Sequence, residues 1–255
     1  MKTFLAVLKT RNITFYWMGW FCIGATVVCA TLATLTETQI MGINAWIKPM
    51  KFYLSTTILV WTLAWLLHYL KSSKTVQWYT RMVMFVFVFE LFYITYKAAS
   101  GGLSHFDIST PFSGIMFALM GILISIMTLW TAYIGGLFFF RTFPELPNAY
   151  VWGIRLGFLL FVIFAFEGGM MANQMAHTVG AADGGTGLPL VNWSVEHGDL
   201  RIAHFLGMHA LQILPLAAYY VFKKSGQVLV FALLYALGVS WTLWNALQGM
   251  PLVLF

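Results

Sequence analysis

Four of the six histidines of this 255-residue chain lie in one stretch, residues 171–216, together with four charged residues. The whole chain carries only 14 basic and 8 acidic residues, so the concentration is unusual. The residues concerned are His177, His197, His204, His209, Asp183, Glu196, Asp199 and Arg201. Imidazoles and carboxylates are the groups that proteins use to bind transition metals and to transfer protons. We therefore expect the functional site in this stretch.

The first chemistry that these residues suggest is a metal site. His177, His204 and His209 are the candidate ligands for zinc, iron or copper, with Glu167 or Asp183 as a fourth ligand or general base. On a helix, His204 and His209 bound a polar arc of roughly 140°. Their spacing of five is awkward for binding one ion, so the loop after His177 would have to fold back over the site. The alternative is that the histidines form hydrogen bonds between helices.

A second group of polar residues is expected to hold a small anionic or amphipathic substrate, such as a lipid headgroup. Arg201, Lys51 and Lys97 would bind its negative charge, although Lys51 also fits an interfacial anchor. The other candidate substrate-binding residues are Asn245, Gln248, Gln212 and Trp193. Glu90 joins Glu167 and Asp183 as a candidate catalytic carboxylate.

The composition shows where such a site would sit. Hydrophobic residues make up 60% of the chain, charged residues only 9%, and the mean hydropathy is +0.82. A soluble domain carries roughly 25% charged residues, so the chain is predicted to be a polytopic membrane protein with the lipid bilayer as its surroundings. The net charge of +6 then reflects the distribution of basic loops rather than a nucleic-acid partner.

The fold class is predicted to be all-α, a bundle of seven transmembrane helices forming one domain over residues 1–255. Each span approaches the roughly 20 apolar residues that a bilayer requires, and backbone groups in lipid must be bonded within the segment. The predicted helices cover residues 14–36, 51–70, 77–98, 112–140, 149–173, 199–222 and 227–249. The loop at about 174–198 is the predicted functional loop.

The basic residues set the predicted orientation. Alternating spans place ten of the 14 on one side, which is therefore predicted to be cytoplasmic. These ten are Lys2, Lys9, Arg11, Lys71, Lys74, Arg81, Arg141, Arg155, Lys223 and Lys224. The N-terminus is thus expected inside, and the C-terminus and the functional loop on the periplasmic or extracellular side of a bacterial-type inner membrane.

Several polar side chains are expected at one depth in the outer half of the membrane. An ionised group at mid-membrane costs about 2.5–3.5 kcal/mol and usually marks a site. The sequence therefore predicts one polar cavity lined by Glu90, Lys97, Glu167, His204, His209 and Asn245. Within it, Glu90 and Lys97 are expected to interact through Tyr93.

Two local features are expected to shape the loop beside this cavity. The segment GAADGGTGLP is typical of a tight turn with positive-φ positions. Asp199 is placed to cap the following helix, because its side chain can accept hydrogen bonds from free N–H groups. His105 and Asp107, in the segment SHFD, are interpreted as part of a solvated loop.

These observations favour a membrane-embedded enzyme with a metal-assisted site that opens to the outer leaflet. One alternative is a proton-coupled transporter in which Glu90, Glu167 and the histidines relay protons. Another is a haem-binding redox or assembly protein. The sequence itself specifies neither the substrate nor the reaction.

Overall fold

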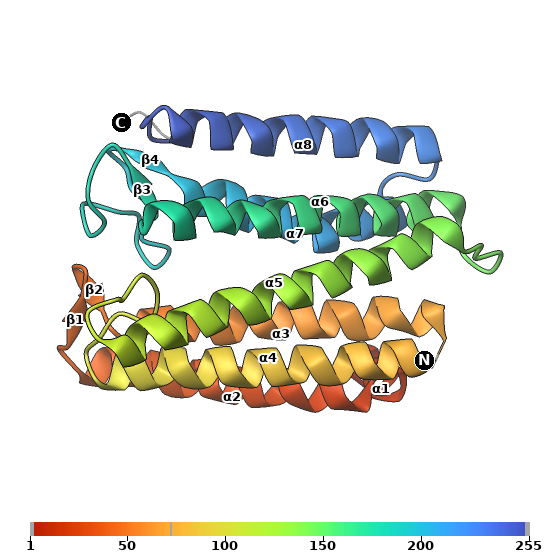
Figure 1. Ribbon diagram of the computed structural model, residues 1–255. Helices are drawn as coiled ribbons and strands as arrows, with labels where there is room; N and C mark the ends of the chain where they lie inside the picture. Colours follow the sequence, from red (N-terminus) through yellow and green to blue (C-terminus); the bar gives the residue numbers. More distant parts are fainter. Residues whose placement is uncertain (1–2, 72, 253–255) are drawn as a thin grey trace. The chain divides into compact units, whose positions relative to one another are not determined.

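The computed structural model describes residues 3–71 and 73–252, and helices dominate it (Figure 1). The helices of this part of the chain are α1 (Phe4–Arg11), α2 (Ile13–Leu35), α3 (Ile47–Leu67), α4 (Lys74–Ala99), α5 (Pro111–Phe140), α6 (Asn148–Gln174), α7 (Leu200–Tyr220) and α8 (Ser225–Leu247). A 3₁₀ turn, η1 (His68–Leu70), extends α3. Two antiparallel hairpins pair β1 (Gln39–Ile40) with β2 (Ile43–Asn44) and β3 (Thr178–Val179) with β4 (Gly198–Asp199). The predicted helical fold class is confirmed.

Seven of the helices, α2 to α8, are long and apolar enough to cross a membrane. Each corresponds to one predicted span, and the largest difference is at the start of α3, which begins at Ile47 rather than at residue 51. Pro49 lies in the first turn of α3, where a helix tolerates a residue without an N–H group. A proline there therefore does not prevent the helix from starting early.

The short helix α1 was not among the predicted elements. Asn12 separates it from α2, and the Asn12 side chain accepts a hydrogen bond from Phe15 N as the cap of α2. Arg11 ties this corner to α3, because its guanidinium lies 3.7 Å from the ring centre of Trp65 and donates to Trp65 O at 2.9 Å. Lys2, one of the ten basic residues that set the orientation, lies outside the described residues.

The chain forms two compact units, and the boundary falls inside α5. Unit 1 covers Met1–Met127 and unit 2 covers Thr128–Phe255. In unit 1, α2 packs along α3, with Thr57 donating a hydrogen bond to Gly19 O. Tyr53 of α3 shares a hydrogen bond of 3.0 Å with Thr95 of α4. Unit 1 is therefore joined by hydroxyl contacts as well as by apolar packing.

In unit 2, α6 and α7 make the most extensive contact. Small residues allow this close approach: a Cβ on Gly153 would lie 2.8 Å from Leu214 O, and a Cβ on Gly157 would lie 3.1 Å from Ala210 O. Gly207 of α7 meets the ring of Phe164 of α6 in the same way. Small residues at such positions are typical of helices that pack closely in membranes. This contact brings the side chains at the start of α7 against the last turns of α6.

Candidate functional site

The most notable pair in unit 2 is Glu167 of α6 and His204 of α7. Nδ1 of His204 lies 2.7 Å from Phe164 O and 3.2 Å from Glu167 Oε2. A carbonyl oxygen only accepts, so Nδ1 carries the hydrogen and donates it to Phe164 O. Glu167 is 7% exposed, and neither carboxyl oxygen has a hydrogen-bond partner among the described residues. The carboxyl group of Glu167 therefore lies next to the His204 ring and forms no hydrogen bond with another described residue.

The position of the His204 ring depends on Gly168. A Cβ at this position would lie 2.9 Å from His204 Cε1, closer than side chains normally approach. The neighbouring Gly169 has open space around it. The Gly-Gly pair thus has one glycine that makes room for the imidazole and one that does not.

His209 is held in a similar way but by different atoms. Its Nδ1 donates to Phe205 O at 2.8 Å, and its ring lies on the Phe205 ring with 4.1 Å between centroids. Trp193 of the loop meets the same phenylalanine edge-on at 5.5 Å. For both His204 and His209, Nε2 has no hydrogen-bonding partner among the described residues. Each ring therefore presents one free nitrogen.

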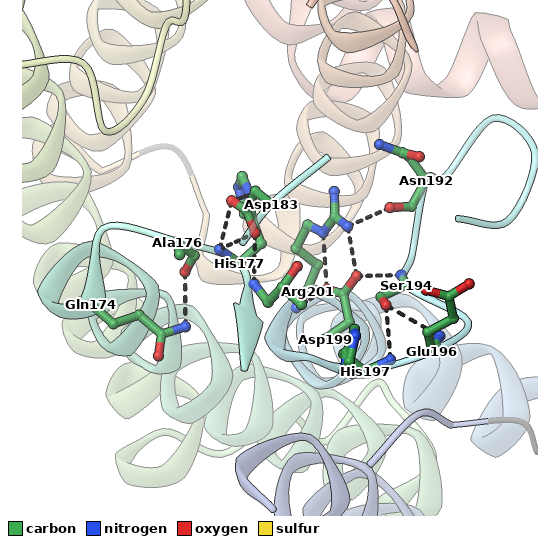
Figure 2. Close-up of polar contacts among 11 residues, drawn as sticks. Gln174, Ala176, His177, Asp183, Asn192, Ser194, Glu196, His197, Asp199 and Arg201 are labelled. Atoms are coloured by element: carbon green, nitrogen blue, oxygen red, sulfur yellow. Dashed lines mark hydrogen bonds and ion pairs between the residues drawn. The ribbon is translucent and has the colours of Figure 1, made fainter. Parts of the chain in front are cut away.

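His177 is joined to Asp183 within the loop (Figure 2). Asp183 accepts hydrogen bonds from the backbone N of His177 and of Thr178, at 2.8–3.0 Å, and from His177 Nδ1 at 2.8 Å. Burial alone would raise the pKa of Asp183, but these hydrogen bonds together outweigh it and hold the pKa well below its usual range. The turn between them contains Gly180 and Gly184 at positive φ, as predicted.

Asp199 caps α7, as predicted, and also binds Arg201. Its carboxylate accepts from Arg201 N at 3.0 Å, from the Arg201 guanidinium at 2.6 and 2.9 Å, and from Ser194 N at 2.8 Å. Figure 2 shows the guanidinium reaching Asn192 O as well. The Asp199 side chain is fully buried and Arg201 is 25% exposed. The charge of Arg201, a predicted substrate-binding residue, is therefore compensated inside the protein.

The hairpin β3–β4 places this loop against the last turn of α8. Gly198 packs on Ala246 O, and a Cβ on Gly180 would lie 3.7 Å from Gly249. The predicted substrate residues Asn245 and Gln248 lie at the same helix end, where Gln248 is the C-cap and Asn245 O accepts from its backbone N at 3.1 Å. Asn245 is half-buried, whereas Gln248 is exposed. Gln212, another predicted substrate residue, is half-buried in α7.

In unit 1 the structure gives Lys97 a partner that the sequence interpretation missed. Lys97 Nζ lies 2.7 Å from Asp107 Oδ2 and 3.3 Å from Ser113 Oγ. The expected link from Lys97 through Tyr93 to Glu90 is not formed, since the Tyr93 hydroxyl has no partner among the described residues. The hydrogen bond from Lys97, followed by those from Ser109, holds the pKa of Asp107 well below its usual range.

His105 was also underestimated by the sequence interpretation. Its Nδ1 lies 3.2 Å from Lys48 Nζ and 3.1 Å from Ser104 Oγ, so the SHFD segment is bonded to α3 rather than simply solvated. The sequence did contain a signal for these contacts: His105 and Asp107 lie in a loop next to helices that carry Lys48 and Lys97. Lys51, the remaining predicted substrate residue, is half-buried in α3.

The predicted metal ligands do not come together in one group. Across residues 3–71 and 73–252, no set of three or more His, Cys, Asp and Glu side chains is arranged to hold a metal ion. His177, His204 and His209 each donate to a different acceptor. The shared metal site therefore stays a prediction, and so does the single cavity, whose residues are divided between the two units.

Comparison with known proteins gives no further guidance: the chain matches no protein-family model, no curated protein and no solved structure.

Proposed function

We propose that the chain is a multi-pass protein of a bacterial-type inner membrane, with its N-terminus in the cytoplasm. Seven helices of sufficient length and apolarity support insertion. The split of the basic residues, ten against four, supports the orientation. In this arrangement the loops at 36–46, 100–110 and 175–199 face the periplasm or the cell exterior. The residues of both units discussed above then lie toward the outer leaflet.

We propose further that the protein is a membrane-embedded enzyme in which His204 is the general base and Glu167 orients it. The observation that carries this proposal is that Nδ1–H of His204 is fixed by Phe164 O, with a buried carboxylate at 3.2 Å, while Nε2 is free. A histidine that works as a base needs one nitrogen fixed in this way and the other open to the reacting proton. When Nε2 takes a proton, the carboxylate of Glu167 stabilises the imidazolium.

The chemistry that this pair supplies is removal of a proton from a water molecule or a substrate hydroxyl. The substrate would be a small amphipathic molecule that enters from the outer leaflet. The aromatic surface formed by Trp193, Phe205 and His209 offers contact for its apolar part. Arg201 is a weaker choice for an anionic part, because Asp199 already compensates its charge.

The packing of unit 2 favours an enzyme over a transporter. The buried core residues shared by α6, α7 and α8 are apolar, among them Leu160, Ala210, Leu214, Ala232 and Val239. A transport pathway through unit 2 would have to cross this apolar layer. A catalytic site that is reached from one side requires no such pathway, so the acid–base pair fits a reaction at the outer leaflet.

Turnover of lipid-like esters and phosphoesters by the purified protein tests this proposal. We expect a subset of the panel to be consumed, with Glu167→Gln reducing the rate about 10²–10⁴-fold and His204→Gln abolishing it. His197→Gln, in the loop before α7, should retain the wild-type rate. Equal rates for the wild type and His204→Gln on every consumed substrate would contradict the role of His204.

A metal-assisted or haem-binding site is the second candidate. The observation in its favour is that Nδ1 of both His204 and His209 is bonded to a carbonyl, since metal-binding histidines usually donate their other N–H to such an acceptor. The described residues supply single donors rather than a complete set of ligands.

Metal analysis and a visible spectrum of the purified protein test this second candidate. Stoichiometric zinc, iron or copper supports a metal site, and a Soret band supports haem. His204→Ala and His209→Ala should then each lower the metal or haem content, whereas His68→Ala should leave it unchanged. Loss of stability in the two α7 variants without any bound metal or haem in the parent would favour a structural role.

A further inference from the structure

Unit 1 contains two buried polar groups that lack partners. Glu90 is 5% exposed and Tyr93 is 1% exposed. Oε1 of Glu90 and the hydroxyl of Tyr93 have no hydrogen-bond partner among the described residues. Because residues three apart on a helix share a face, the two groups lie one turn apart on α4. Buried polar groups are normally bonded, so two orphans together call for an explanation.

The surroundings of Tyr93, one turn from Glu90, are apolar. Tyr93 packs in a cluster with Ile94 of α4 and Met120 of α5, and Phe89 and Met116 cover it. None of these neighbours can bond to a carboxylate. An ionised carboxylate without hydrogen bonds is strongly disfavoured in such a place, and a carboxyl group there tends to become neutral instead.

One positive charge opposes that tendency. Lys48 of α3 acts electrostatically on Glu90, and its ammonium group also lies 3.2 Å from His105 Nδ1. Lys97, two turns further along the same face of α4, is compensated by Asp107. The titratable and charged groups on these elements include Cys22 and Cys29 of α2, Lys48, Lys51 and Tyr53 of α3, Tyr93 and Lys97 of α4, and His105 and Asp107 of the loop.

We infer that Glu90 is a second proton-binding site, in unit 1, at which the carboxyl group binds and releases a proton while the Lys48–His105 pair stabilises the ionised form. The ligand is the proton itself: the protonated carboxyl is neutral and suits a buried position, and the carboxylate is balanced by the ammonium group of Lys48. This site is separate from the Glu167–His204 pair and does not rest on the proposed enzymatic function.

Infrared spectroscopy of the full-length protein in lipid nanodiscs, titrated with buffer, tests this inference. We expect a C=O band of a protonated carboxylic acid at neutral pH that shifts in D₂O and disappears reversibly as the pH rises. Glu90→Gln should remove this band. Glu167→Gln, in unit 2, and Glu145→Gln, at an exposed position, should leave it in place.

A second variant keeps the test decisive if Glu90→Gln does not fold. Lys48→Met removes the charge that stabilises the ionised form, so the band should persist to higher pH than in the wild type. Lys74→Met, which removes an exposed lysine, should not shift the titration. A band that is unchanged in Glu90→Gln, an absence of any such band in the wild type, or a Lys48→Met titration equal to that of the wild type would overturn the inference.

Discussion

Glu167 Oε2 lies 3.2 Å from Nδ1 of His204, yet the hydrogen on that nitrogen is directed to Phe164 O at 2.7 Å. The carboxyl group thus lies beside the ring rather than acting as its main hydrogen-bond acceptor, and when ionised it places a negative charge next to the imidazole. Such an arrangement stabilises a positive imidazole more than a neutral one. It leaves Nε2 as the nitrogen available for chemistry.

The first prediction concerns Gly168, the residue that makes room for the ring. Gly168→Ala introduces a Cβ at 2.9 Å from His204 Cε1, so the ring must move or the helices must separate. We expect a loss of stability of about 1–3 kcal/mol and a loss of any turnover that depends on His204. Gly169→Ala is the matched control, because nothing lies within 4 Å of the added Cβ. Thermal unfolding in detergent measures the difference, and equal stability of the two variants would count against the close contact.

The second prediction concerns the loop carboxylate Asp183 and acid. The folded state lowers the pKa of Asp183 below its usual value of about 3.9, so its contribution to stability is complete above that pH and is lost as the pH falls through the folded value. Hydrogen exchange at the backbone amides of His177 and Thr178 should therefore stay slow near neutral pH and become progressively faster as the pH falls below about 4 toward the lowered pKa, after correction for intrinsic rates.

Asp183→Asn should open the same turn without acid. The asparagine NH₂ group cannot accept the hydrogen bonds that the second carboxylate oxygen accepts, so we expect a cost of about 1–3 kcal/mol in local opening. Glu196→Gln, an exposed acid in the same loop, should leave these amides protected. Protection of His177 and Thr178 that is identical in the wild type and Asp183→Asn would contradict the assignment.

The third prediction concerns the ion pair at the start of α7. Asp199→Ala removes the helix cap and leaves Arg201 without its carboxylate, so unfolding should become easier by about 3 kcal/mol. The double variant Asp199→Ala/Arg201→Met should lose less than the sum of the single variants, because the unpaired charge is also removed. Additive losses in a double-mutant cycle would show that the two side chains do not depend on each other.

The fourth prediction concerns topology. A reporter fused after residue 255 should report the periplasm, and one inserted at Ser225 should report the cytoplasm, because of the distribution of basic residues. A cytoplasmic signal from the C-terminal fusion would reverse the orientation, and the sites described above would then open to the wrong side for an outer-leaflet substrate.

Much of the fold could be predicted because the relevant signals are local. A run of apolar residues bounded by basic loops specifies a membrane-spanning helix, and Asp199 before an apolar run specifies a cap. The partners of the site residues were harder to predict. Lys97 bonds to Asp107 and His105 to Lys48 because of the path that the 100–110 loop takes, which helical periodicity does not encode.

His177 illustrates the same limit in the other unit. The sequence suggested that His177 and Asp183 had separate roles at a metal site, whereas the turn at Gly180 and Gly184 folds the aspartate back onto His177. The contact between Glu167 and His204 was easier to anticipate, because both were predicted in the outer parts of adjacent spans. The position of the His204 ring depends on Gly168. A glycine in an apolar helix gives no indication in the sequence of which neighbour it accommodates.

The most direct test of the central claim is the labelling of the intact protein by diethyl pyrocarbonate, with each modified histidine located by mass spectrometry. This reagent reacts with an unprotonated imidazole nitrogen that is not engaged by a partner. The proposed role of His204 predicts carbethoxylation at Nε2, with His197, in the loop before α7, as a check on access of the reagent. An unlabelled His204 in a sample in which His197 is fully labelled would contradict the claim that Nε2 of His204 is the free, reactive nitrogen of the site.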